Sequence, residues 1–185
     1  MQIYEPREDS ELLKSVIKKY SGGFVLDVGT GTGILAQEAA KTADKVLAID
    51  INKKAIEYCK NNINNKRITF KQSNLFKNIK EKFDLIIFNP PYLPEDKKVR
   101  DIALDGGEQG YELIEKFLKQ AKTHLKSNGK ILLLYSSLTN KEKIQKIIKE
   151  NNYNFKIIKT KKLFFEELYV VLIKKKRKLL AQKIF

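Results

Sequence analysis

Leu26-Asp27-Val28-Gly29-Thr30-Gly31-Thr32-Gly33 is the stretch that decides the fold of this 185-residue chain. It begins in an apolar run, Phe24 to Val28, that has the length and composition of a short buried strand. Three glycines follow at every second position, and an apolar helical pattern begins at Ile34. Glycine allows tight turns and close approach of the backbone to a ligand. The stretch therefore predicts a strand, a ligand-binding turn and a helix, which is how many α/β domains begin.

Outward from this stretch, strand and helix patterns alternate along the whole chain. We expect strands at 24–28, 45–49, 67–70, 83–88, 130–135, 155–159 and 168–173. We expect helices at 10–20 with Ser10 as the N-cap, at 34–41, at 52–63, at 111–125 and after Asn140. This order predicts an α/β, doubly wound, mostly parallel seven-stranded sheet whose last two strands form an antiparallel hairpin. Ligands of such sheets bind beyond the carboxyl ends of the strands, near the topological switch point.

Composition predicts one domain over residues 1–173 and a basic tail over 174–185. The tail is either a solvated segment or a docking element for RNA or an acidic partner. One cysteine and one histidine are too few for the usual zinc clusters, so we expect no metal. No apolar run approaches the roughly 20 residues that span a bilayer, and the first residues do not resemble a signal peptide. We therefore expect a cytoplasmic protein with no membrane contact.

The net charge of +15 has two interpretations. It favours polyanionic partners such as nucleic acid. A lysine-rich composition also arises from heat adaptation or genome composition.

Three polar residues near the ends of the predicted strands are candidate ligands of a nucleoside cofactor, and Asp27 favours S-adenosylmethionine over a dinucleotide. Asp27 precedes the glycines, where a carboxylate would repel a pyrophosphate and suits a positively charged amino-acid portion. Asp50 ends the second strand and can accept from both ribose hydroxyls, although it can also cap the following helix. Asn74 follows the third strand and can accept from an adenine amino group, although it can also be a plain turn residue.

Asn89-Pro90-Pro91-Tyr92 follows the fourth strand and supplies the candidate catalytic loop. The prolines stiffen the loop and aim the Asn89 side-chain oxygen and the Pro90 carbonyl at one point. A planar NH2 group offers two donors to such a pair of acceptors, and Tyr92 would stack on its flat face. The expected chemistry is methyl transfer to an amide or amino nitrogen, driven by positioning and electrostatics.

These motifs together resemble the class I methyltransferases that modify glutamine, adenine or cytosine amino groups. The opening Tyr4-Glu5-Pro6-Arg7-Glu8-Asp9-Ser10 resembles the archaeal and eukaryotic HemK-like branch. The resemblance extends from about Tyr4 to Ile173. It implies methylation of the glutamine in the Gly-Gly-Gln motif of a peptide chain release factor. For the eukaryotic members it also implies a small zinc-binding activator subunit.

The resemblance also implies roles for individual residues in contact with the cofactor or the substrate. They are Ser10, Asp27, Gly29, Gly31, Asp50, Asn74, Leu75 and Asn89. Asn74 departs from the aspartate usual in the family, so the charge at that position is lost. The segment Leu104 to Gly110 resembles a family glycine-rich stretch, and either shapes the substrate channel or is a flexible turn.

The sequence therefore predicts an S-adenosylmethionine-dependent glutamine methyltransferase that acts on a release factor. The alternative is an adenine methyltransferase acting on DNA or RNA, which the basic charge favours. The short chain, without a recognisable target-recognition domain, speaks against that alternative.

Overall fold

The computed structural model describes residues 3–91 and 110–176 of the chain. The first half contains α1 (Glu8–Tyr20), β1 (Phe24–Val28), α2 (Ile34–Ala39), β2 (Lys45–Asp50), α3 (Lys53–Asn62), β3 (Ile68–Gln72) and β4 (Phe83–Phe88). The second half contains α4 (Glu112–His124), β5 (Leu125–Ser136), the 3-10 turn η1 (Ser137–Thr139), α5 (Lys141–Glu150), β6 (Tyr153–Lys162) and β7 (Glu167–Lys175).

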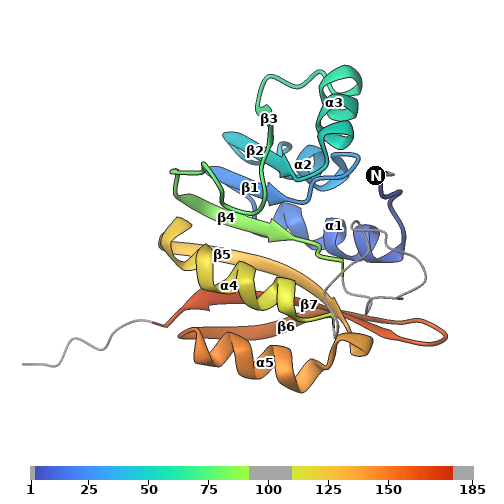
Figure 1. Ribbon diagram of the computed structural model, residues 1–185, viewed down its shortest axis with the longest axis vertical. Coiled ribbons are helices and arrows are strands. Elements are labelled where there is room, and N and C mark those ends of the chain that lie inside the picture. The colour runs from blue at the N-terminus through green and yellow to red at the C-terminus, as the bar shows by residue number, and fades with distance from the viewer. Residues whose placement is uncertain (1–2, 92–109, 177–185) are drawn as a thin grey trace, which may run out of the picture.

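The strands form one seven-stranded sheet in the order β3-β2-β1-β4-β5-β7-β6. β1 to β5 run parallel to one another, whereas β7 pairs antiparallel with β5 and with β6 (Figure 1). The topological switch point lies between β1 and β4, because the chain builds outward from β1 in both directions. The predicted doubly wound sheet with a C-terminal antiparallel hairpin is confirmed.

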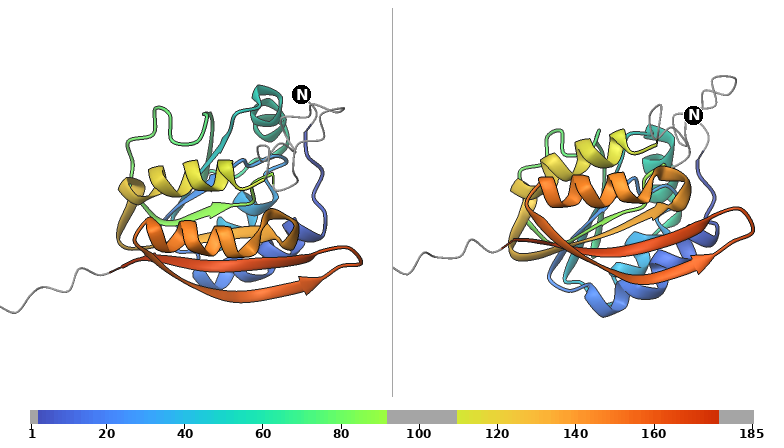
Figure 2. Two further views of the ribbon diagram at one scale, coloured as in Figure 1. Left: turned by 60° about the horizontal axis from the view of Figure 1, so that its bottom comes forward. Right: turned by 90° about the horizontal axis from the view of Figure 1, so that it is seen from below.

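Helices cover both faces of the sheet, which explains why the central strands are apolar at nearly every position. Side chains of β1 alternate between the faces: Leu26 and Val28 join one apolar cluster, and Val25 joins the other. The first cluster includes buried residues of α4 and α5, and the second includes those of α1 and α2. Figure 2 shows α4 and α5 together on one side of the sheet and α1 on the other.

Several element boundaries differ from those predicted. Helix α1 begins at Glu8, and its N-cap position, Arg7, makes no capping hydrogen bond from its side chain. Ser10 therefore lies inside the first turn as a buried residue, not at the cap. Local capping preference had indicated Ser10, but its burial beside the strand ends determines its place instead.

Strand β5 begins at Leu125, five residues earlier than predicted, because Leu125 pairs with Phe83 of β4 across a register shift. The predicted turn at 127–129 thus lies within the strand. A Cβ at Gly129 would approach the Phe83 carbonyl oxygen to 2.8 Å, so the irregular pairing requires glycine there. Strands β6 and β7 are also longer than predicted because they pair with each other along almost their whole length.

None of the helices within residues 3–91 and 110–176 is both long and apolar enough to cross a membrane. The same part of the chain holds no group of three or more His, Cys, Asp or Glu side chains placed to bind a metal ion.

Candidate active site

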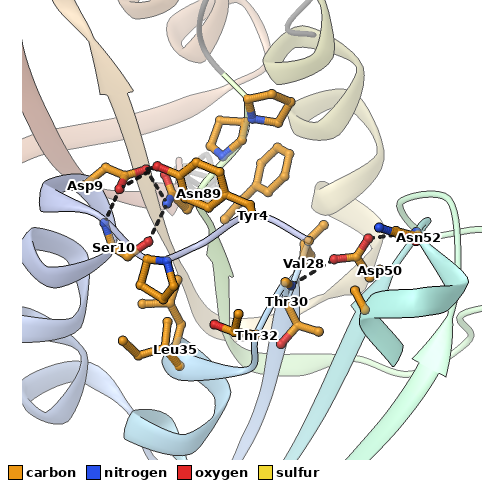
Figure 3. A pocket seen from close by; sticks show the side chains of 18 of the residues that line it. Tyr4, Asp9, Ser10, Val28, Thr30, Thr32, Leu35, Asp50, Asn52 and Asn89 are labelled. Carbon is orange, nitrogen blue, oxygen red and sulfur yellow. Dashed lines mark hydrogen bonds between the residues drawn. The ribbon is translucent and has the colours of Figure 1, made fainter. Parts of the chain in front are cut away.

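One cavity of about 480 Å³ lies beyond the carboxyl ends of the parallel strands, at the switch point between β1 and β4. We consider the residues that were predicted to bind cofactor or substrate and that the structure describes. All but one of them border this cavity. Those that border the cavity are Ser10, Gly29, Gly31, Asp50, Asn74, Leu75, Asn89 and Pro90. Figure 3 shows Asp9, Ser10 and Asn89 on one side of the cavity and Asp50 with Asn52 on the other. The fold therefore brings together residues from five separate segments of the sequence.

The glycine loop between β1 and α2 forms the floor of this site. Gly31 and Gly33 have φ angles of 54° and 81°, in the left-handed region that favours glycine. A Cβ at Gly33 would also lie 2.4 Å from the Ile63 side chain, so the loop packs too closely on α3 for any larger residue. The Cys59 thiol donates to the Gly31 carbonyl oxygen at 3.3 Å, which ties the loop to α3.

The Asp50 carboxylate, at the end of β2, also holds the glycine loop in place. Its Oδ2 accepts from the Gly31 backbone N–H at 2.9 Å, and its Oδ1 accepts from the Asn52 N–H at 2.8 Å. Burial raises the pKa of Asp50, and the hydrogen bonds from Asn52, Gly31 and Ile51 oppose that shift. A carboxylate has about four lone-pair sites, so Asp50 keeps acceptor capacity on the cavity side. Both predicted interpretations of Asp50 are compatible, because the residue anchors the chain before α3 and also borders the cavity.

Asp27 is the exception among the predicted residues, because it does not border the cavity. It is fully buried beneath the glycine loop, where its Oδ2 accepts from the Thr30 hydroxyl at 2.7 Å. Its Oδ1 has no hydrogen-bond partner among the described residues. Burial raises the pKa of Asp27 from 3.8 to about 7, and the nearby Asp50 adds to this shift. The structure therefore places Asp27 under the loop, not in direct contact with the ligand space.

The turn after β3 contributes Asn74 and Leu75. Leu75 has a φ of 48°, a strained conformation for a residue with a branched side chain. The Ser73 hydroxyl lies 2.9 Å from the Leu75 carbonyl oxygen and 2.6 Å from that of Lys77, which holds the turn. Leu75 is buried, whereas Asn74 is exposed. A buried apolar side chain and an exposed polar side chain thus lie next to each other at this edge of the cavity.

Asn89 is held by residues of α1 that lie about eighty positions earlier in the chain. Its Nδ2 donates to Asp9 Oδ2 at 2.9 Å and lies 3.5 Å from Ser10 Oγ. A carboxylate only accepts hydrogen bonds, so the amide NH2 of Asn89 must face Asp9 and its Oδ1 must face away. That oxygen is buried and has no partner among the described residues. The Asn89 amide is therefore held in one orientation, with an acceptor oxygen that no described residue satisfies.

Asp9 is itself fixed from two further directions. Its carboxylate accepts from the Tyr4 hydroxyl at 3.0 Å and from the Ser10 backbone N–H at 2.6 Å. Burial and the neighbouring Asp9 raise the pKa of Tyr4, so Tyr4 stays protonated and donates.

Tyr4 and Asp9 were not assigned roles from the sequence. Both belong to the opening motif, and that motif was the available signal for them. Tyr92 and residues 104–109 of the glycine-rich segment lie outside the described residues, so their predicted roles stay predictions.

The cavity suits S-adenosylmethionine in both shape and chemistry. It combines the Asp50 carboxylate with apolar residues, Leu75 and Ala55 among them, and is also lined by Asn89, whose side-chain oxygen has no partner among the described residues. The carboxylate suits ribose hydroxyls, and the apolar residues suit a flat base. The Asn89 oxygen suits an NH2 group beside the reacting methyl.

The sheet order and the position of the cavity define a class I methyltransferase, with a Rossmann-like fold that uses S-adenosylmethionine as methyl donor. Residues 7–165 match the methyltransferase small domain, and the chain belongs to that family.

The chain is similar to proteins named as glutamine methyltransferases. It is 39% identical over 178 residues to the Methanocaldococcus jannaschii protein named as a protein N5-glutamine methyltransferase, covering 92% of this chain and 90% of that one. It is 34% identical over 149 residues to a release factor glutamine methyltransferase of Lactococcus lactis, covering 71% of this chain. The match spans only 55% of the Lactococcus protein, so the chain covers about half the length of that bacterial relative.

A solved structure of the same fold is the Encephalitozoon cuniculi (E. cuniculi) Mtq2–Trm112 complex, described as responsible for methylation of the translation termination factor eRF1. The TM-score is 0.78 at 26% identity, covering 95% of this chain and 99% of that one.

Proposed function

We propose that this enzyme methylates the side-chain amide nitrogen of the glutamine in the Gly-Gly-Gln motif of a peptide chain release factor. The observation that carries the proposal is the buried Oδ1 of Asn89, which has no partner among the described residues at one end of the cavity. The names of the archaeal and bacterial relatives and the eRF1 activity of the Mtq2 complex support this substrate.

The residues that would hold the cofactor lie along the floor and the far side of the cavity. Asp50 would accept from the ribose, the backbone of Gly29 and Gly31 would pass close to the cofactor, and Leu75 with Asn74 would enclose the base. When bound, S-adenosylmethionine supplies an electrophilic methyl group on a sulfonium. Asp27 would act from below, by holding Thr30 and thereby the glycine loop.

Asn89 and Pro90 would orient the substrate amide. The Asn89 Oδ1 would accept one amide N–H, and the carbonyl oxygen of Pro90 would accept the other. Two fixed acceptors draw electron density onto a nitrogen that is otherwise a poor nucleophile, and they align it for attack. The rigid Tyr4–Asp9–Asn89 chain would prevent the amide of Asn89 from rotating its own NH2 toward the substrate.

The geometry favours a neutral NH2 over a lysine ammonium. Both carboxylate oxygens of Asp9 are occupied by Tyr4, Ser10 and Asn89, so the acceptors left for the substrate are uncharged amide oxygens. An ammonium placed there would lose its hydration without gaining direct contact with a carboxylate oxygen.

We further propose that the enzyme works in the cytoplasm, where release factors act. A small activator subunit comparable to Trm112 in the Mtq2 complex is its proposed partner.

The test is transfer of labelled methyl groups from S-adenosylmethionine, with and without a Trm112-like subunit. The acceptors are a release factor, its Gly-Gly-Gln→Gly-Gly-Ala variant, DNA and RNA. We expect label on the intact factor alone. Label on nucleic acid and not on the factor would replace the proposal with an adenine methyltransferase.

Asn89→Ala provides the matching test of the site. It should lower turnover by at least about 10³-fold, since it removes an acceptor that acts on the reacting group. Cofactor affinity, measured by calorimetry, should stay within about tenfold. Normal turnover by this variant would exclude Asn89 from the catalytic role.

A further inference from the structure

The β6–β7 hairpin carries an apolar tip that the site itself does not use. Phe164 and Phe165 are 92% and 84% exposed, and they are the two most exposed large hydrophobic residues that the structure describes. Their rings pack edge to face with centroids 4.6 Å apart. Figures 1 and 2 show the hairpin reaching beyond the rest of the sheet on the side where the N-terminal segment lies.

The residue types at this tip are not dictated by the turn. The Leu163 N–H donates to the Glu166 carbonyl oxygen at 2.8 Å, so Phe164 and Phe165 are the two central residues of a tight turn. Two-residue hairpin turns usually hold Asn, Asp or Gly where a positive φ is needed, but neither phenylalanine has a positive φ, so this turn permits many residue types. Turn geometry therefore does not explain the two phenylalanines, and exposed aromatic pairs are typical of binding surfaces.

The tip is continuous with the active-site cavity. Leu163 and Glu166, which flank the two phenylalanines, both border that cavity. Glu166 is fixed by a hydrogen bond from the Ser136 hydroxyl, and the Glu167 N–H is bound by the Ser137 hydroxyl at 2.9 Å. The tip end of the hairpin is thus tied to the end of β5 and to η1, and the tip adjoins the cavity.

The strand leading to the tip is basic. Lys156, Lys161 and Lys162 are exposed and make no ion pair with any residue in the described part of the chain. The acids nearby are already bound, since Glu166 accepts from Ser136 and Glu167 accepts from the Tyr169 hydroxyl at 2.6 Å. The arm still carries more lysines than glutamates, so net positive charge surrounds an apolar tip.

We propose that the β6–β7 arm, defined as Lys156 to Glu167, is the docking surface for the acceptor protein. This inference rests on the proposed function. The occupant is the release factor itself, which would place an apolar surface against Phe164 and Phe165 and acidic residues against the lysines while its glutamine enters the cavity. A membrane on the tip would lie across the mouth of the cavity and block the acceptor.

The test measures the Michaelis constant for the intact release factor. Phe164→Ser/Phe165→Ser should raise KM about tenfold or more and leave kcat within about twofold, because aromatic anchors dominate interface energies. Phe164→Tyr/Phe165→Tyr should recover most of the loss. Tyr58→Ser, which removes an exposed aromatic on α3, is the matched control and should leave KM unchanged.

The basic part of the arm is tested by charge reversal. Lys161→Glu/Lys162→Glu should raise KM strongly at low salt and less at high salt, because screening weakens the lost attraction. Lys60→Glu/Lys66→Glu makes the same change of net charge at exposed positions elsewhere and should have a much smaller effect.

The outcomes separate this inference from the proposed function. An active wild-type enzyme whose arm variants keep the same KM would overturn the docking surface and leave the function intact. Loss of RNA binding by the arm variants, with KM for the factor unchanged, would also overturn it. A wild-type enzyme that never labels the factor would refute both.

Discussion

At the scale of single residues, the orientation of one amide determines what this site can do. Asn89 offers either a donor or an acceptor to the cavity, depending on the rotation of its side-chain amide. The Asp9 carboxylate settles the choice, because it accepts the NH2 and leaves Oδ1 unsatisfied. Asp9 is thus a positioning residue, since it acts through Asn89.

Asp9→Asn should lower kcat by about 10²-fold, because an asparagine there can turn the Asn89 amide to the wrong face. The measurement is steady-state kinetics on the release factor, with cofactor affinity measured separately. We expect the loss in kcat to exceed any change in the KM of either substrate. Glu11→Gln, an exposed change in the same helix, is the control. Full turnover by a folded Asp9→Asn enzyme would show that Asn89 is oriented by other contacts.

The buried Asp27 makes stability depend on pH. Its pKa is about 7 in the folded chain against 3.8 when unperturbed, with burial as the largest cause. Below pH 3.8 both states carry the proton. Between about pH 4 and pH 7 the unfolded chain releases it and the folded chain retains it, so stability falls as pH rises through this window.

Asp27→Asn should remove this slope while keeping an acceptor for Thr30. Urea unfolding at pH 5 and pH 8 should show the stability of the wild type, relative to the variant, falling by up to about 3 kcal/mol between the two. Parallel pH profiles for the two proteins would mean that the carboxyl group titrates normally in the folded state.

At the scale of elements, the antiparallel edge of the sheet depends on the full length of β7. Lys174 pairs with Lys130 of β5, and Lys175 pairs with Tyr153 of β6. The Lys175 ammonium donates to the Leu125 carbonyl oxygen at 2.7 Å, and the Lys176 N–H donates to that of Asn152 at 3.0 Å. The basic run predicted to be tail therefore begins within the strand.

A chain ending at Lys176 should unfold at nearly the same temperature as the full chain, because it keeps every contact just named. A chain ending at Ile173 should be less stable by about 2 kcal/mol, since it loses several backbone and side-chain hydrogen bonds at roughly 1 kcal/mol or less each. Thermal denaturation of the two truncations provides the comparison. Equal midpoints would show that these final pairs contribute nothing.

At the scale of the whole molecule, cofactor binding links segments that are distant in the sequence. Helix α1, the glycine loop, the ends of β2 and β3 and the loop after β4 all border one cavity. A ligand that binds only the assembled cavity stabilises the entire fold. Saturation with S-adenosylmethionine at 100 times Kd should add about 2.7 kcal/mol and raise Tm by roughly 5–10 °C.

Asp50→Ala should abolish most of that thermal shift at the same cofactor concentration. Asp84→Ala is the matched control, because Asp84 lies outside the cavity and binds Phe24 N–H and Lys126. It should lower the Tm of the free protein yet keep the cofactor-induced shift. An unaltered shift in the Asp50 variant would remove Asp50 from the cofactor site.

The sequence alone was sufficient to predict the features of the fold that depend on local sequence patterns. Alternating strand and helix signals predicted the order of elements, and the three glycines predicted the loop at the carboxyl end of β1. Asp50 and Asn89 were found because each directly follows a buried strand, and parallel strands end at one edge of the sheet. Errors arose where tertiary contacts overrode local preference, as at the early start of β5 and at Ser10.

Only the tertiary structure decided how those residues act. Asp27 lies in the predicted strand, yet its burial under the loop, away from the cavity, follows from the packing of α1 and α2 on that face. The direction of the Asn89 amide depends on α1, eighty residues earlier, meeting the end of β4. The periodicity of a sequence predicts which face of a helix or strand a residue occupies, because that face depends only on the neighbouring residues in the chain. A hydrogen bond between distant segments exists only once the sheet has brought them together.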